Sequence, residues 1–251
     1  MRVEKIAAHE SRFDQTGKDS SGFKHSLIRK SIEVSGQGGM MNYIDAGLSS
    51  GDESYYYRNR YEKDQIVLHF TMGYLGGDIA TLTKHDYHVS VPFVLGRNGT
   101  IYNLFPSFYW SYHLGRGAIG GNATRSKKTI GIEISNIGPL SLQGSNLRTT
   151  YGDIYCSQAQ HDHYVPQPFR DYEYFASYTD AQYDSLVLLL RYLTLRYGIP
   201  RKFLNKTNRF KAGSFVQDFR GIVSHANYRS SDKVDIGPAF DWERVIAGIN
   251  A

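Results

Sequence analysis

The sequence predicts an α/β protein in which a central mixed β-sheet is flanked by α-helices, with an N-terminal extension and a long irregular insertion. Two observations carry this prediction: several short apolar runs have the composition of buried strands, and one long segment has the apolar spacing of a helix. Strands and helices that alternate along a chain bury their apolar faces as a sheet covered by helices. At 251 residues, the chain is long enough for one sizeable domain with an extension.

The N-terminal segment is expected to be a weakly structured arm that packs on the main body. It mixes charged residues with Gly and Ser, as in 35–42 and 47–60, and shows no sustained helical or strand period. A segment of this composition buries too little apolar surface for a core of its own. We therefore divide the chain into an arm, residues 1–60, and a principal domain, residues 61–251.

The first strong strand signal is the apolar run at 64–70, which is rich in Ile, Val and Leu. Such a run is typical of a strand that is buried on both faces. A Gly-marked turn and a short helix at 78–84 follow. The runs at 89–95 and 100–105 are joined by a Gly-Arg-Asn-Gly segment, which predicts a β-hairpin. Pro92 inside the first of these runs favours an edge position or a bulge.

The next strand signal lies at 129–135, where isoleucines alternate with small or polar residues and Glu133 faces away from the isoleucines. Residues from about 138 to 178 show no clean period and contain many turn formers and tyrosines. We expect this segment to be the long irregular insertion, because loops of such length are usually functional or disordered.

The clearest helix begins after Thr179, which forms a predicted capping box with Gln182. Apolar residues then follow at the i, i+3, i+4, i+7 spacing until a Gly and a Pro end the helix. A last strand at 221–225 and a short helix at 241–249 complete the predicted fold.

Composition and charge limit the classes of function. The net charge of +5 favours an anionic partner, such as nucleic acid or an anionic cell-wall polymer. No stretch approaches the roughly 18 apolar residues of a membrane span. The basic N-terminus has no apolar region behind it, so no secretory signal peptide is expected. The single cysteine, Cys156, cannot form an intrachain disulfide and has no base placed to activate it, which favours a structural role.

Two histidines at strand ends are candidate metal ligands. His69 and His225 each end an apolar run, and Asp235 follows ten residues after the second, in a loop that contains Pro238. Two imidazoles and a carboxylate suit zinc, and a catalytic site leaves the fourth position to water. On the residues alone, however, a histidine at a strand end is more often an ordinary polar residue.

Six segments, taken in order, carry a resemblance to a known family: residues 64–71, 96–105, 111–115, 129–135, 178–200 and 221–242. The chain resembles the zinc-dependent N-acetylmuramoyl-L-alanine amidases of the phage lysozyme-amidase and peptidoglycan recognition protein type, also called the amidase-2 family. The last segment is the most specific, since it holds a His, a Lys, an Asp, a Gly-Pro pair and Phe-Asp-Trp in register.

The resemblance implies a role for each matching residue. It implies a zinc ion bound by His69, His225 and Asp235. Glu133 matches the general base that takes a proton from the attacking water. Lys233 matches the residue that stabilises charge on the scissile carbonyl, where one such donor is worth roughly 3–4 kcal/mol. A further residue, His113, matches a pocket histidine that helps to hold the substrate or the transition state.

The implied activity is hydrolysis of the amide bond between N-acetylmuramic acid and L-alanine, with peptidoglycan rather than nucleic acid as the partner. The absence of a signal peptide leaves several routes to the cell wall: phage lysis by an endolysin, delivery by a virion or injection system, or cytoplasmic synthesis. Two alternatives stay open, a non-catalytic peptidoglycan-binding module and a virion component that carries a wall-degrading domain. The complete ligand set together with Glu133 and Lys233 favours the enzyme. The sequence leaves the oligomeric state open.

The chain departs from the family pattern in three places. Val91-Pro92 stands where many relatives have Tyr-His or Ala-His, and Phe70-Thr71-Met72 replaces another common segment. The insertion is longer than the family pattern predicts. We expect the insertion to lie beside the zinc cleft and its tyrosines to form one wall: Tyr151, Tyr155, Tyr164, Tyr172 and Tyr174. A second metal at His161-Asp162-His163 is not expected, because adjacent loop residues rarely converge on one ion.

Overall fold

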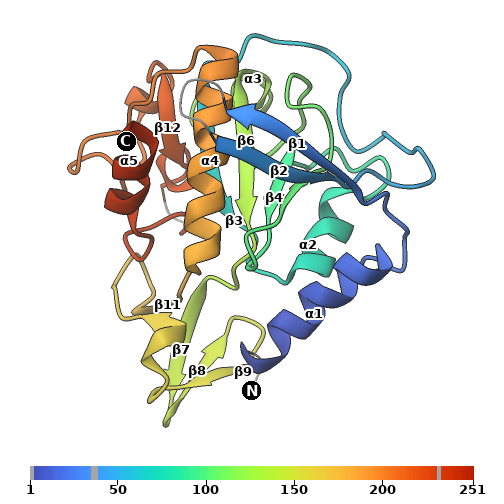
Figure 1. Ribbon diagram of the computed structural model, residues 1–251. Coiled ribbons are helices and arrows are strands. Elements are labelled where there is room, and N and C mark those ends of the chain that lie inside the picture. Colours follow the sequence, from blue (N-terminus) through green and yellow to red (C-terminus); the bar gives the residue numbers. More distant parts are fainter. Residues whose placement is uncertain (1–2, 35–38, 231–232) are drawn as a thin grey trace.

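The computed structural model describes residues 3–34, 39–230 and 233–251. A seven-stranded mixed sheet forms the centre, in the order β1-β2-β5-β4-β6-β3-β12 (Figure 1). Its strands are β1 (Ile28–Val34), β2 (Gly39–Asp45), β3 (Gln65–Phe70), β4 (Phe93–Leu95), β5 (Ile101–Asn103), β6 (Thr129–Ile134) and β12 (Gly221–Ser224). The strands β12, β3, β6 and β4 run parallel to one another, whereas β5 is antiparallel to β4. The predicted mixed α/β fold is confirmed.

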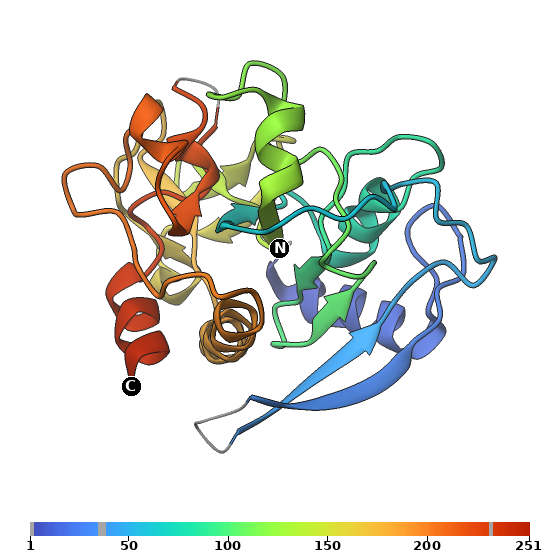
Figure 2. The ribbon, with the colours of Figure 1, turned by 90° about the horizontal axis from the view of Figure 1, so that it is seen from above.

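Helices cover both faces of this sheet. On one face, α4 (Asp180–Tyr197) and α5 (Trp242–Asn250) pack against the isoleucines of β6 and the apolar residues of β3. On the other face, α1 (Val3–Thr16) and α2 (Leu75–Leu82) enclose a second cluster that includes Phe13, Ile79 and Val94. A shorter helix, α3 (Asn122–Lys128), leads into β6. Figure 2 shows α4 end-on beside the sheet and the β1–β2 hairpin along its edge.

Several predicted elements are confirmed with small shifts. All six residues of β3 are buried, as expected for a strand covered on both faces. The hydroxyl of Thr179 accepts a hydrogen bond from the Gln182 N–H at 3.1 Å, and the capping box is complete. That helix ends at Gly198, whose φ of 62° lies in the left-handed region. The predicted edge position for Pro92 is wrong, because β4 begins at the following residue and lies between β5 and β6.

The prediction of a weakly structured arm is wrong for the described part of residues 1–60; residues 1–2 and 35–38 lie outside it. Helix α1 spans 14 residues there, and β1 and β2 extend the central sheet. The buried side of α1 combines Ile6 and Phe13 with a charged residue, Glu10, which obscures the helical period in the sequence. The division of the chain at residue 60 stays a prediction.

The insertion is not irregular. It forms a five-stranded antiparallel sheet in the order β10-β11-β7-β8-β9. Its strands are β7 (Pro139–Gln143), β8 (Asn146–Thr149), β9 (Ile154–Ser157), β10 (Tyr164–Val165) and β11 (Tyr174–Ala176). Each has two to five residues, which is too short for alternation to be visible in the sequence. This sheet lies below the main one in Figure 1 and encloses a third apolar cluster, in which Cys156 is buried.

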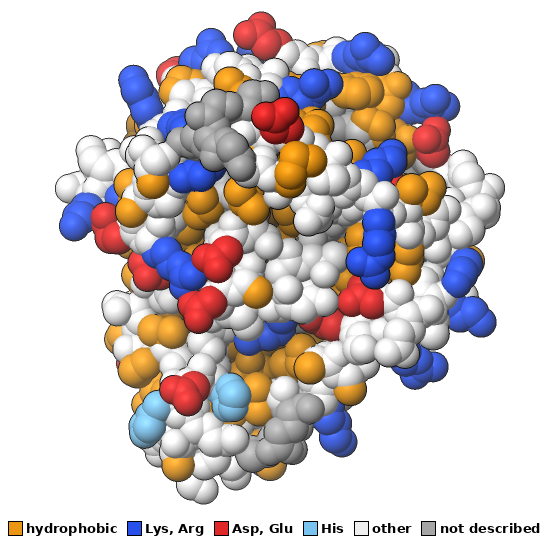
Figure 3. Space-filling model, viewed as in Figure 1, with side chains coloured by type: hydrophobic (Ala, Val, Ile, Leu, Met, Phe, Trp, Pro, Cys, Tyr) orange, Lys and Arg blue, Asp and Glu red, His pale blue; other side chains and the backbone are white. Residues whose placement is uncertain are grey.

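Three short 3₁₀ turns complete the described structure, at His161–His163, Ser214–Val216 and His225–Asn227. Among the described helices, none has the length and apolar composition that crossing a bilayer requires. Basic and acidic side chains are interspersed on the face shown in Figure 3, so the positive charge is not gathered into one patch there.

Candidate active site

The ends of two neighbouring strands bring the candidate histidines together. β3 and β12 are parallel neighbours, with Leu68 opposite Ser224. His69 is the next residue of β3, and His225 begins the 3₁₀ turn that follows β12. The hydroxyl of Ser224 caps that turn by accepting from the Ala226 N–H at 3.0 Å. Two adjacent strands therefore end at the same sheet edge with an imidazole on each.

Backbone hydrogen bonds fix Asp235 beside these histidines. The Ala226 N–H donates to the Asp235 carbonyl at 2.7 Å, and the Ile236 N–H donates to the Ser224 hydroxyl at 2.8 Å. The loop that carries Asp235 is thereby held to the turn that carries His225. Its carboxylate reaches the space between the two imidazoles.

Three ligand atoms meet at one buried point. Nδ1 of His69 and Nδ1 of His225 are 2.9 Å apart. Oδ2 of Asp235 lies 3.3 Å from Nδ1 of His69 and 2.8 Å from Nδ1 of His225. All three residues are buried. The sequence-predicted ligands are thus brought together by the fold.

The opposite ring nitrogens show where the protons lie. Nε2 of His225 is 3.0 Å from the carbonyl of Leu114, which can only accept, so this nitrogen carries the proton. Its Nδ1 therefore presents a lone pair to Asp235.

The tautomer of His69 follows from a chain of three hydrogen bonds. The Thr129 hydroxyl donates to the Arg125 carbonyl at 2.9 Å, so it accepts from Nε2 of His113 at 2.8 Å. Nδ1 of His113 is then unprotonated and accepts from Nε2 of His69 at 3.0 Å. This leaves Nδ1 of His69 with a lone pair as well. Both ring nitrogens of His113 are used inside the protein, which favours a positioning role for it over the expected contact with substrate.

The three atoms fit a zinc ion. Two nitrogen lone pairs and a carboxylate oxygen face one another, an arrangement that is stable only with a cation or an added proton between them. Zinc bonds of about 2.0–2.2 Å place tetrahedral ligands roughly 3.3–3.6 Å apart, so the side chains need to separate by only a few tenths of an ångström. Burial, and then the neighbouring His225, lower the pKa of His69 to about 4, which keeps its imidazole neutral near pH 7. Burial alone would raise the pKa of Asp235, but the two imidazoles bring it below its usual range.

Glu133 lies beside this centre on the adjacent strand. It pairs in register with His69, and its Oε1 is 4.0 Å from Nδ1 of that histidine. Its Oε2 is buried and accepts no hydrogen bond from the described residues. Burial, followed by the carboxylates of Asp235 and Asp78, raises its pKa well above the usual range. Oε2 is therefore an acceptor with no hydrogen-bond partner among the described residues, and its surroundings favour its taking a proton.

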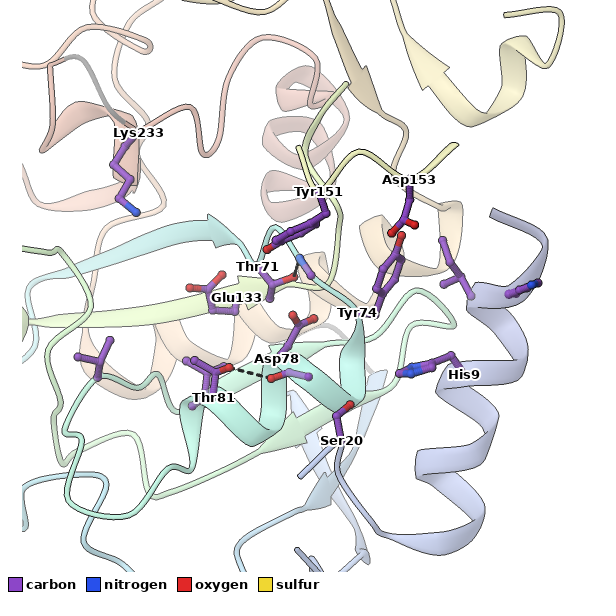
Figure 4. Close-up of a pocket in the computed structure, with 16 residues that line it drawn as sticks. His9, Ser20, Thr71, Tyr74, Asp78, Thr81, Glu133, Tyr151, Asp153 and Lys233 are labelled. Carbon is purple, nitrogen blue, oxygen red and sulfur yellow. Dashed lines mark hydrogen bonds between the residues drawn. The ribbon is translucent and has the colours of Figure 1, made fainter. Parts of the chain in front are cut away.

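Glu133 and Lys233 lie at one end of a groove of about 750 Å³ (Figure 4). The groove continues between α2 on one side and the turn between β8 and β9 on the other, and it reaches α1. Its walls include Thr71, Asp78, Thr81, Tyr151, Asp153 and His9. The Lys233 amine thus faces the same space as the Glu133 carboxylate.

The insertion borders the groove only in part. Tyr151 and Asp153 line it, which confirms the predicted location for the turn between β8 and β9. Tyr155 and Tyr164 are buried in the core of the insertion, so the prediction that they face the groove is wrong. The others, Tyr172 and Tyr174, pack against apolar clusters.

Arg170 holds the loop of Lys233 through contacts that the sequence did not indicate. Its guanidinium donates to the Lys233 carbonyl, to the Ala226 carbonyl at 3.1 Å and to the Arg229 carbonyl at 2.7 Å. The insertion therefore fixes the backbone on both sides of the loop that carries Lys233. No spacing or motif connects Arg170 with that loop in the sequence, so only the fold could reveal the contact.

Comparison with known proteins gives a consistent result. Residues 59–238 match the family model described as N-acetylmuramoyl-L-alanine amidase. The amidase AmiD of Escherichia coli (strain K12) is 25% identical over 185 residues, which are 72% of this chain and 51% of AmiD. The chain thus spans about half the length of this curated relative.

Solved structures with related folds include two amidases. One is AmiD from E. coli in complex with the substrate anhydro-N-acetylmuramic acid-L-Ala-D-γ-Glu-L-Lys, at 21% identity and a TM-score of 0.49, covering 87% of this chain and 65% of that one. The other is AmpD, at 21% identity and a TM-score of 0.45, covering 75% and 86%.

Proposed function

Because the chain belongs to the N-acetylmuramoyl-L-alanine amidase family, we propose that it hydrolyses the amide bond between N-acetylmuramic acid and L-alanine in bacterial peptidoglycan. The observation that carries the proposal is the convergence of two imidazole lone pairs and a carboxylate beside the unpartnered oxygen of Glu133. We propose zinc as the ion that His69, His225 and Asp235 bind. When bound, zinc would polarise the scissile carbonyl and make water more acidic.

Glu133 would act as the general base. Its buried carboxylate takes a proton from the attacking water as the water oxygen bonds to the carbonyl carbon. The raised pKa then favours transfer of that proton to the departing nitrogen as the C–N bond breaks. The products are a carboxylic acid on the muramic acid side and a free amine on L-alanine, so atoms and charge balance.

Lys233 would stabilise the transition state. Its ammonium faces the groove next to Glu133, where negative charge develops on the carbonyl oxygen during attack. A fixed donor in such a place typically accelerates the reaction by roughly 10²–10³. Its position depends on the contact between its backbone carbonyl and Arg170.

We place the action of this enzyme at the bacterial cell wall, in lysis or remodelling. The endolysin, virion and injection-system routes remain alternatives for how it reaches the wall. A non-catalytic binding module is the second candidate function, and the orphaned Glu133 oxygen argues for the enzyme.

Mass spectrometry of digested peptidoglycan tests the proposal. Zinc-loaded protein should release stem peptides that begin with L-alanine and leave the glycan strands uncut. The Glu133→Gln variant, which keeps the size of the side chain, should release about a hundredfold less. Binding to sedimented wall with no released peptide would instead identify a binding module, and cut glycan would contradict the amidase assignment.

A further inference from the structure

Helix α1 lies outside the segment that matches the family, yet it is fixed to the catalytic framework. The Glu10 carboxylate accepts from the backbone N–H groups of Arg97 at 2.9 Å and Asn98 at 3.3 Å, in the turn between β4 and β5. Phe13 is buried against the ring of Tyr102 at 5.5 Å between centroids. These contacts hold the helix against the main sheet.

The first turns of α1 are also held by the insertion. Ile6 is buried in the same apolar cluster as Leu147 and Tyr155. In Figure 1 the start of α1 lies beside β9, at the end of the insertion sheet. The helix therefore packs between the two sheets, and these contacts position its groove-facing side chains.

Those side chains form the end of the groove that is farther from Lys233. Lys5, Ile6 and His9 line it there, and Figure 4 shows His9 at the opposite side of the view from Lys233. The groove thus runs from the proposed reaction centre to a cationic residue of α1. Its volume of about 750 Å³ is within the range of about 300–1,000 Å³ that holds drug-sized ligands.

The lining is suited to a peptide rather than a glycan. The Ser20 hydroxyl lies along it, and so does the Thr81 hydroxyl, which donates to the Gly77 carbonyl and can still accept from a peptide N–H. Sugar rings prefer to stack on exposed aromatic faces, and only the rim residue Tyr151 offers a largely exposed one among the described residues of the lining.

We propose that α1 forms the distal subsite for the stem peptide, in which Lys5 binds a carboxylate at the C-terminal end of that peptide. This inference rests on the proposed function and adds a specificity-determining residue to it. Lys5 is solvent-exposed, so it can take up a ligand carboxylate without losing a buried contact.

Binding of a defined peptide tests the inference without any cleavage. Isothermal titration calorimetry would compare L-Ala-D-γ-Glu-L-Lys, with a free C-terminal carboxylate, against the same peptide with a C-terminal amide. The protein should bind the free acid roughly two- to fivefold more tightly, as expected for one exposed ion pair. The Lys5→Glu variant should lose or reverse this preference, whereas Lys5→Arg should keep it.

The matched control is Arg12→Glu, which makes a similar charge change at an exposed position of the same helix. This variant should keep the preference for the free acid. Equal binding of acid and amide by the parent protein, no binding of either, or an unchanged preference in Lys5→Glu would overturn the inference. Because no bond is cut in this assay, such a result leaves the mass-spectrometric test of amidase activity independent.

Discussion

The Nδ1 atoms of His69 and His225 lie 2.9 Å apart, each with its ring proton on the opposite nitrogen. Their closest approach is therefore between two lone pairs, with a carboxylate oxygen of Asp235 beside both. Such a cluster is repulsive unless a cation or an added proton lies between the three atoms. This requirement gives the site its expected affinity for metal.

Replacing a ligand should remove the metal. We expect about one zinc per chain in the parent protein and less than about one tenth in His225→Ala, because two ligands hold zinc far more weakly than three. Elemental analysis by mass spectrometry after dialysis measures this content. The exposed His85 serves as the control, and His85→Ala should retain zinc. Full zinc content in His225→Ala would contradict the ligand assignment.

Glu133 and Lys233 should be needed for turnover and not for the metal. We expect Glu133→Ala and Lys233→Ala each to keep zinc and to lose about 10²-fold or more in kcat, since one acts as the base and the other on the oxyanion. Steady-state kinetics with a muropeptide, together with the zinc content of each variant, separates the two effects. Parental rates in both variants would show that the assigned mechanism is wrong.

Thr129 should control zinc affinity from a distance. In Thr129→Val the hydroxyl that accepts from His113 is lost, so this histidine no longer has a fixed tautomer and holds His69 less well. Loss of such a supporting hydrogen bond typically lowers metal affinity by about 10–100-fold. Competition with a zinc chelator would measure it. Thr194→Val, another buried threonine that bonds a carbonyl of its own helix, should leave zinc affinity unchanged.

Asp78 should make stability depend on pH. Burial raises the pKa of this carboxyl from 3.8 to about 7 in the folded protein. The folded state therefore holds the proton more tightly than the unfolded state, and stability falls as the pH rises from about 4 to about 7. A shift of about three units corresponds to at most about 4 kcal/mol in the free energy of unfolding.

The Asp78→Asn variant removes this ionisation while it keeps an acceptor for the Ser135 hydroxyl. The variant's free energy of unfolding minus that of the metal-free parent should be about 2–4 kcal/mol larger at pH 8 than at pH 4.5. Denaturant unfolding at both pH values measures the difference. The exposed Asp86 provides the control, and Asp86→Asn should show no such change.

The sequence predicted those elements whose structure depends on their own residues and near neighbours in the chain. The strand with His69 is buried on both faces and therefore reads as an unbroken apolar run. Thr179 and Gln182 cap α4 through their own side chains, so the local sequence was sufficient. The three candidate ligands, which the fold brings together, were predicted because both histidines end apolar strands and the resemblance links them to Asp235.

Elements whose order depends on distant partners were missed. The inward face of α1 contains Glu10, which is satisfied by N–H groups nearly ninety residues away in the chain. No local sequence pattern predicts that a carboxylate of this kind is buried. The role of Arg170 is equally non-local, since its three carbonyl partners lie more than fifty residues further on.

The pairing of β2 with β5 sets a practical limit on how this chain can be shortened. β5 lies between β4 and β2, so a fragment that starts at residue 59, where the family match begins, would leave the side of β5 that pairs with β2 at Tyr102 and Asn103 open. It would also uncover the pocket that Phe13 fills. Open strand edges beside exposed apolar surface recruit other chains. Recombinant fragments cut at that boundary should therefore collect in inclusion bodies, and a usable truncated enzyme has to keep the first helix and hairpin.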